Sequence, residues 1–208
     1  IAFVDAQVGK VLDALEQSRH KDNTLVMLWS DHGQNFGEHK NWRKQSLWEE
    51  STHVPLVIKL PKQVQGQSCH QVASLLDIYP TLTQLCQLPD VDSNEGLSLK
   101  TLINNPEHNR NQPAITTWGY KNHSVRDEKW RYIQYRDGSE ELYDHLNDAN
   151  EHYNLANNPK YTPIKEQMKL WLPQENKLPS HMSEWGEDFL EERLNKWQQA
   201  NGIPDWLS

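Results

Sequence analysis

An aspartate and a histidine stand side by side directly after an apolar run, and both can bind a metal ion. Residues 25–29 are apolar, and the chain continues with Ser30-Asp31-His32-Gly33. Such a run, bounded by polar residues, predicts a buried strand of a parallel sheet, and open α/β sheets bind ligands at the carboxyl ends of such strands. Asp31 and His32 are therefore candidate metal ligands, and Gly33 lets the backbone turn sharply after them.

A simpler interpretation of the pair also stands. Asp31 would then cap a turn and His32 would be an ordinary surface histidine, because Asp-His dipeptides are common. The dipeptide alone favours this simpler interpretation, and the strand before the pair and the glycine after it give the metal site equal support. Carboxylate oxygens suit Ca²⁺ or Mg²⁺, whereas an imidazole nitrogen suits Zn²⁺ or Mn²⁺, so the residues alone leave the metal open.

Lys44 and His39 are the next candidates, in a long polar stretch over residues 33–52. An ammonium group near a metal would bind an anion and neutralise charge that develops on its oxygens. From the residues alone, the favoured interpretation of Lys44 is a solvated lysine, like its neighbours Lys40 and Arg43. His39 could act as a general acid or support a metal ligand, or it could simply bond to the backbone.

Other side chains near these candidates have mainly structural interpretations. The carboxylates of Glu49 and Glu50 could orient a cation, but loop carboxylates are usually solvated. Trp42 and Trp48 would line a pocket or, more simply, pin the loop to the core. Arg126, far along the chain, would reach a substrate only if the C-terminal strands folded over the strand ends.

Composition excludes several classes of protein. The 208 residues carry a net charge of -8 with no basic block, which argues against a nucleic-acid or anionic-membrane binder. A mean hydropathy of -0.90 is low for a compact domain, so we expect sequence outside this chain to supply part of the core. No apolar stretch is long enough to span a membrane, and the two cysteines, Cys69 and Cys86, form neither a disulfide framework nor a metal-type CxxC pair.

The pattern of elements predicts an α/β fold with a small C-terminal antiparallel β subdomain and flanking helices. We expect an α/β part over residues 1–112 and a C-terminal subdomain over residues 113–208. Helices are predicted at residues 1–17, 77–88, 162–172 and 184–200, with Asp77 as the cap of the second. Strands are predicted at residues 25–29, 54–60, 114–118, 123–126, 130–135 and 141–143, the last four as a meander.

In their order and spacing these motifs resemble the sulfatase family. The resemblance begins with Ser30-Asp31-His32-Gly33, Gly37-Glu38-His39, Trp42 and Lys44. It continues through Val54-Pro55-Leu56, Leu76-Asp77-Ile78-Tyr79-Pro80-Thr81, Trp130-Arg131-Tyr132-Ile133 and Glu141-Leu142-Tyr143-Asp144. It covers the chain from residue 1 to about residue 170, and it is closest to the branch that contains iduronate-2-sulfatase and choline-sulfatase-like enzymes.

The resemblance implies an alkaline-phosphatase-like α/β sandwich that hydrolyses sulfate esters. In such enzymes a formylglycine, made from cysteine or serine, attacks sulfur while a divalent metal, usually Ca²⁺, holds the reacting oxygens. By this resemblance Asp31 and His32 would be two metal ligands and Lys44 would contact the sulfate. His39 belongs to the motif and is grouped with Lys44 on the substrate side, without a defined role.

The chain departs from the family pattern because it lacks the segment that carries the formylglycine precursor. Neither Cys69 nor Cys86 stands in the Cys-x-Pro-Ser-Arg context that the family uses. We therefore assign no catalytic residue within this chain. It resembles the C-terminal portion of a sulfatase, and we expect the 208 residues alone to be inactive.

Two other functions compete with a sulfatase. A phosphonate or phosphate ester hydrolase of the same superfamily would share the Asp-His metal chemistry, and a non-catalytic remnant would only bind sulfated glycans. The expected partner is a sulfated small molecule or glycan of unspecified identity. The resemblance is compatible with a periplasmic, extracellular or lysosomal location, and it leaves the oligomeric state open.

Overall fold

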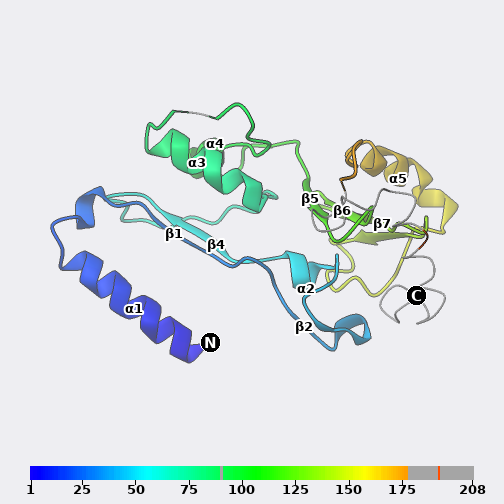
Figure 1. The fold of residues 1–208 in the computed structure, drawn as a ribbon, viewed down its shortest axis with the longest axis horizontal. Coiled ribbons are helices and arrows are strands. Elements are labelled where there is room, and N and C mark those ends of the chain that lie inside the picture. The colour runs from blue at the N-terminus through cyan, green and yellow to red at the C-terminus, as the bar shows by residue number, and fades with distance from the viewer. Residues whose placement is uncertain (90, 178–191, 193–208) are drawn as a thin grey trace. The chain divides into compact units, whose positions relative to one another are not determined.

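The computed structural model describes residues 1–89, 91–177 and 192 (Figure 1). By its internal contacts the chain divides into two compact units. The first unit joins Ile1–Asp31 to Val54–Ser68, and the second joins His32–His53 to the chain from Cys69 onward. The chain thus leaves the first unit between Asp31 and His32 and returns to it at Val54.

The first unit contains one long helix and a pair of strands. Helix α1 (Ala2–Glu16) follows the predicted helical spacing, yet none of its residues is buried. Strand β1 (Val26–Trp29) pairs with β4 (Leu56–Lys59), and the pairing is antiparallel.

The prediction of a buried parallel strand at residues 25–29 is therefore wrong. Strand β1 is partly buried over its first half and exposed over its second, with Trp29 48 % exposed. An uninterrupted apolar run predicts burial on both faces, but among the described residues only β4 pairs with this strand.

The second unit begins with the stretch that carries the site candidates. Strands β2 (Asn35–Phe36) and β3 (Trp42–Arg43) form a short antiparallel hairpin, which we call the site hairpin. Helix α2 (Glu49–Thr52) follows it and is a single turn. The long polar stretch over residues 33–52 therefore contains two short strands and a helical turn.

Two helices precede the C-terminal sheet. Helix α3 (Ile78–Leu85) ends before the predicted boundary, and α4 is a short helix at Lys100–Asn104. Asp77 stands at the N-cap position of α3, but its carboxylate makes no capping bond to that helix. It instead completes a capping box with Ser74 and forms an ion pair of 2.6 Å with Arg110.

The predicted C-terminal meander is confirmed. Its four strands lie in sequence order, and each pairs antiparallel with the next: β5 (Ala114–Thr117), β6 (His123–Arg126), β7 (Trp130–Gln134) and β8 (Glu140–Asp144). Helix α5 (Thr162–Lys169) begins with a proline in its first turn. The helix predicted at residues 184–200 lies outside the described residues, apart from position 192.

The well-packed core of the second unit lies on the two faces of this sheet. One face packs Val125, Tyr132 and Leu142 against residues that include Met168 of α5. The other packs Ile133, Tyr135 and Tyr143 against Leu47 and Trp48, which directly precede α2. Because side chains alternate along a strand, neighbouring residues of β7 serve opposite faces.

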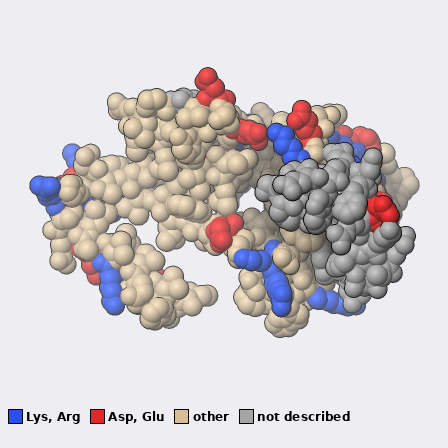
Figure 2. Space-filling view, in the orientation of Figure 1, with Lys and Arg blue, Asp and Glu red and all other residues tan. Residues whose placement is uncertain are grey.

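The surface carries both signs of charge. On the face shown in Figure 2, Lys and Arg side chains occur as small separate groups among Asp and Glu side chains. Within the part of the chain that the structure describes, no helix is both long enough and apolar enough to cross a membrane.

Candidate functional site

Gly33 allows the candidate stretch to lie directly against α2. Its amide donates to the Ser51 carbonyl at 2.9 Å, and the next amide, of Gln34, donates to the Glu50 carbonyl at 2.8 Å. A Cβ atom at position 33 would lie 1.9 Å from the Glu50 carbonyl oxygen. The close approach of the two backbones therefore requires glycine, which the sequence had suggested for its turn.

His32 and Lys44 lie together. The Lys44 Nζ atom is 2.8 Å from His32 Nε2, and His32 Nδ1 is 2.8 Å from the Gly33 carbonyl oxygen. A carbonyl oxygen only accepts, so Nδ1 carries the proton, and Nε2 presents its lone pair to the ammonium group. A lone pair on Nε2, with the tautomer set by a backbone carbonyl, is the arrangement that metal-binding histidines use.

Asp31 and His32 fall on either side of the boundary between the two units. Asp31 is the last residue of the first unit and is exposed, whereas His32 opens the second unit and is half-buried. The two side chains offer one carboxylate and one imidazole donor. Divalent metals accept both kinds of donor, but Ca²⁺ takes about six to eight oxygen ligands, so these two side chains alone would not make a complete site.

His39 occupies a different environment from His32. Its ring stacks on Trp48 with 4.3 Å between ring centroids, and it meets Tyr143 edge-on at 6.4 Å. Its backbone is left-handed, with φ of 49°, and its Nε2 atom is buried without a hydrogen-bond partner. The structure thus places His39 in an aromatic stack, where its role as a substrate-side residue stays a prediction.

The two tryptophans of the stretch differ. Trp48 pins the loop to the core, as the sequence suggested: it is 4 % exposed, and its indole N–H donates to Glu141 at 2.8 Å. Trp42 does not, because it is 67 % exposed on the site hairpin opposite Phe36. Its ring lies beside Gly37, and a Cβ atom added to that glycine would be 3.4 Å from the ring.

Glu49 belongs to a buried ionic network and is not the solvated loop carboxylate that sequence reasoning favoured. Arg131 pairs with both Glu49 and Glu151, and Arg126 lies 3.3 Å from Glu49. His145 also contacts Glu151, at 2.7 Å. Arg126, which we considered for substrate contact, is therefore engaged inside the second unit.

Sequence reasoning missed Arg131 and Glu151 because both are charged residues that the fold buries. The Arg131 side chain is 2 % exposed and that of Glu151 is fully buried. The one available signal was the position of Arg131 within an apolar strand pattern, where a charged residue implies a buried partner.

The pKa values of Glu49 and Glu151, within this network, are lowered, whereas the pKa of the neighbouring Glu50 is raised. Burial raises the pKa of each carboxyl, but the charges of Arg131 and Arg126 hold the pKa of Glu49 below its ordinary value. Against the same effect of burial, Arg131 and His145 lower the pKa of Glu151. Glu50 has a raised pKa, because burial and the charge of Glu151 both disfavour its ionised form.

Two groups of His and Glu side chains bring possible ligand atoms within 4.8 Å of one another: His39, Glu50 and Glu151, and Glu49, His145 and Glu151. In the second group the carboxylates already pair with Arg131, so a cation would compete with an arginine. In the first group the Nε2 atom of His39 and the Oε2 atom of Glu50 are buried and lack hydrogen-bond partners. A water molecule or a cation between them would satisfy both atoms.

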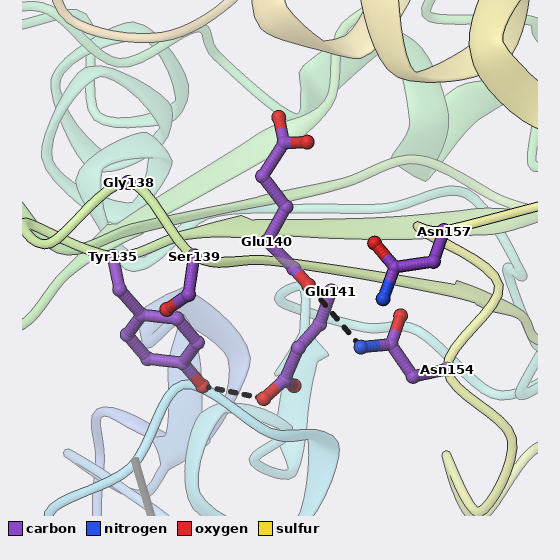
Figure 3. Close-up of a pocket in the computed structure, with 7 residues that line it drawn as sticks. All are labelled: Tyr135, Gly138, Ser139, Glu140, Glu141, Asn154 and Asn157. Carbon is purple, nitrogen blue, oxygen red and sulfur yellow. Dashed lines mark hydrogen bonds between the residues drawn. The ribbon is translucent and has the colours of Figure 1, made fainter. Parts of the chain in front are cut away.

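One cavity of about 330 Å³ lies at the turn between β7 and β8 (Figure 3). Its polar groups are largely bonded within the fold: the Tyr135 hydroxyl donates to Glu141 at 3.1 Å, and the Asn154 amide donates to the Glu140 carbonyl at 3.1 Å. Its lining contains none of the predicted site residues. We therefore place the candidate site at His32 and Lys44 and not in this cavity.

Comparisons with known proteins agree on one family. The Sulfatase family model matches residues 1–88. A sulfatase of Formosa agariphila is 42 % identical over 176 residues, which are 85 % of this chain and 35 % of that protein. Arylsulfatase K of Canis lupus familiaris is 30 % identical over 97 % of this chain and 40 % of its own length. Choline-sulfatase of Rhizobium meliloti is 33 % identical over 77 % of this chain and 32 % of its own length.

Solved structures of a sulfatase and of a phosphonate monoester hydrolase have a similar fold. A 2-O GAG sulfatase superposes with a TM-score of 0.74 at 25 % identity, over 99 % of this chain and 46 % of that one. A phosphonate monoester hydrolase of Agrobacterium radiobacter superposes with a TM-score of 0.69 at 26 % identity, over 81 % of this chain and 38 % of that one. The chain thus shares the α/β fold of these enzymes.

The chain spans between about a third and two fifths of the length of the curated relatives named above. The family model covers the candidate stretch, including His32 and Lys44, and the longer alignments extend the similarity over most of the chain. The protein therefore belongs to the sulfatase family.

Proposed function

We propose that the protein of which this chain forms a part hydrolyses sulfate esters, and that His32 and Lys44 contribute to its active site. The contact of 2.8 Å between His32 Nε2 and Lys44 Nζ carries this proposal. The contact places a metal-binding nitrogen next to a cation. A metal that bound Nε2 would displace the Lys44 ammonium from that lone pair, and the freed ammonium would then be close enough to pair with an anion on the metal.

Asp31 and His32 would hold the divalent cation, with Ca²⁺ as the metal that the family resemblance implies. When bound, the metal would polarise the oxygens of the ester group. The Gly33 carbonyl keeps His32 in the tautomer that can serve as a ligand. Lys44 would bind and orient the sulfate, and it would neutralise the negative charge that develops on the ester oxygens.

The nucleophile would come from residues other than these 208. Both cysteines are exposed, and Cys69 contacts the Pro106 carbonyl through its thiol at 3.3 Å, far along the chain from His32. Neither stands in the family's modification context. We accordingly propose a formylglycine in another part of the longer protein.

The substrate class would be a sulfated small molecule or glycan. The relatives' names point to both kinds, because one is a choline-sulfatase and one solved neighbour is a 2-O GAG sulfatase. A phosphonate or phosphate monoester is the second candidate, supported by the likeness to a phosphonate monoester hydrolase.

Turnover of matched esters tests this proposal. We expect the full-length protein to hydrolyse an aryl sulfate faster than the corresponding aryl phosphate or phosphonate. Chelation should abolish turnover and added Ca²⁺ should restore it, because Asp31 and His32 alone supply no electrophile. A preference for the phosphonate would support the second candidate, and the absence of all three activities in metal-loaded protein would contradict both.

A further inference from the structure

Arg131 reaches from strand β7 to the backbone just before α2. Its guanidinium group is almost fully buried, and Nη1 donates to the Leu47 carbonyl at 3.0 Å and to the Ser124 hydroxyl at 2.7 Å. The other guanidinium nitrogens pair with Glu49 and Glu151. One side chain thus holds both the backbone and a side chain of the segment that begins α2.

Glu151 holds the same segment at a second point. Its Oε2 atom accepts the backbone N–H of Glu49 at 2.9 Å. That amide belongs to the first turn of α2 and has no partner within the helix. Together Arg131 and Glu151 fix the main chain at Leu47 and Glu49, from strand β7 and from the loop after β8.

The segment that they hold is the one on which the candidate stretch rests. The carbonyls of Glu50 and Ser51 accept the amides of Gln34 and Gly33. The buried Asn35 side chain adds a bond of 2.6 Å to the Ser51 hydroxyl. A shift of residues 47–51 would therefore move residues 33–35 with it.

Each of the two site residues is the chain neighbour of a residue that bonds within this arrangement. His32 directly precedes Gly33, and the Arg43 carbonyl, one residue before Lys44, accepts the Asn35 amide at 2.7 Å. The backbones on both sides of the contact between His32 and Lys44 are thus tied to the segment that Arg131 and Glu151 hold.

We propose that Arg131 and Glu151 are positioning residues for His32 and Lys44. They act through residues 47–51 and touch neither site residue. Their importance for catalysis rests on the function proposed above, whereas their control of the geometry does not. A buried ion pair is weak evidence for stability, since apolar residues of similar volume often serve as well. The bonds of this pair to specific backbone groups support a role in geometry.

Arg131→Lys is the informative variant, because it keeps the charge but cannot make the four contacts of the guanidinium. Its matched control is Arg110→Lys. Arg110 is also an arginine of the second unit; its side chain is 10 % exposed, and it pairs with Asp77 at 2.6 Å and donates to the Val72 carbonyl at 3.2 Å. Its bonds go to Gln71, Val72, Asp77 and Leu97, all outside residues 47–51.

Amide hydrogen exchange in the 208-residue chain gives the first readout. We expect Arg131→Lys to accelerate exchange at Gly33 and Gln34 by about tenfold or more, while Arg110→Lys changes it by less than about twofold. The ¹⁵N resonances of the His32 ring give the second readout, and only Arg131→Lys should shift them. Equal behaviour of the two variants in both readouts would overturn the proposal.

Glu151 provides a second test that does not depend on how well Arg131→Lys folds. Glu151→Gln retains an oxygen that can accept the Glu49 amide, whereas Glu151→Ala does not. Exchange at Gly33 and Gln34 should therefore be faster in Glu151→Ala than in Glu151→Gln, and equal rates would overturn the role of Glu151. Neither readout requires catalysis, so missing sulfate turnover would contradict the proposed function alone.

Discussion

Apolar side chains of helix α1 in the first unit are exposed, whereas apolar side chains of the C-terminal sheet are buried. In α1, Phe3 is 78 % exposed and Val11 is 69 % exposed, and no residue of that helix is buried. In the sheet, Tyr132, Ile133 and Leu142 are completely buried. Yet the family model matches residues 1–88, which include the whole first unit, and ends before the sheet begins.

The family model thus covers the first unit and the candidate stretch of the second unit, and it leaves out the buried sheet. His32 and Lys44 are only 12 residues apart in the sequence. The segment on which their stretch rests is held at Leu47 and Glu49 by Arg131 of β7 and by Glu151. The first unit has an exposed apolar surface, which includes Phe3 and Val11. We expect it to become buried in the longer protein, as the low mean hydropathy of the chain suggested.

The largest effect on stability should come from truncating a buried side chain of the sheet, and truncation of an exposed side chain in the first unit provides the comparison. Leu142→Ala deletes a fully buried side chain and should lower the free energy of unfolding by about 2–5 kcal/mol. Leu28→Ala, in the 42 % exposed position on β1, should cost less than about 1 kcal/mol in the 208-residue chain. Chemical denaturation measures both, and similar costs would show that the first unit is as well packed as the sheet.

A second pair of variants compares two glycines. Gly33→Ala places a methyl group against the Glu50 carbonyl and should destabilise the second unit by about 1–3 kcal/mol. Gly9→Ala adds a methyl group to α1, where nothing lies within 4 Å, and should stabilise that helix by about 0.5–1 kcal/mol. Circular dichroism during thermal unfolding distinguishes the two, and a harmless Gly33→Ala would contradict the close approach described above.

Acid should weaken the sheet through Glu140. Although burial opposes it, hydrogen bonds from Lys165 and Lys169 lower the pKa of Glu140 to about 2. The folded-state pKa lies below the unfolded value, so the stabilisation is present above about pH 4.5 and is lost as the pH falls toward 2.

The variant Glu140→Gln should therefore flatten the dependence of stability on pH between about 4.5 and 2. The matched control is Glu95→Gln, which removes an exposed carboxylate outside the sheet. Denaturation curves at stepwise lower pH provide the measurement. An unaltered slope in Glu140→Gln would show that Lys165 and Lys169 contribute little there.

Local pattern predicted much of this fold and part of the site. Alternating residues and turn signals predicted the meander to within a residue or two, because each hairpin is a local structure. The strand at residues 25–29 was predicted as a strand but with the wrong pairing, because its apolar run carries no information about its partner. Asp77 was predicted as a helix cap, but its carboxylate bonds to Ser74 and Arg110, and the latter is 33 residues away.

The supporting network was beyond local pattern altogether. Glu49 and Arg131 are 82 positions apart, and a single sequence gives no reason to pair them. Trp48 and Glu141 pair across 93 positions in the same way. Residue type and spacing could identify candidate site residues such as His32 and Lys44. They could not identify the long-range contacts that fix the geometry of those residues.

The role of Lys44, which directly follows the site hairpin, is tested most directly by comparing it with Lys40, between the two strands of that hairpin. Lys40 is also exposed, and it lies four residues away in the same loop, but it has no contact with His32 among the bonds described above. In the full-length, metal-loaded protein we expect Lys44→Ala to reduce kcat/KM for an aryl sulfate by about 10²–10³-fold, as loss of one transition-state charge partner does. Lys40→Ala should stay within about threefold of the unsubstituted protein. Equal rates in the two variants would contradict the assignment of Lys44 as the sulfate contact.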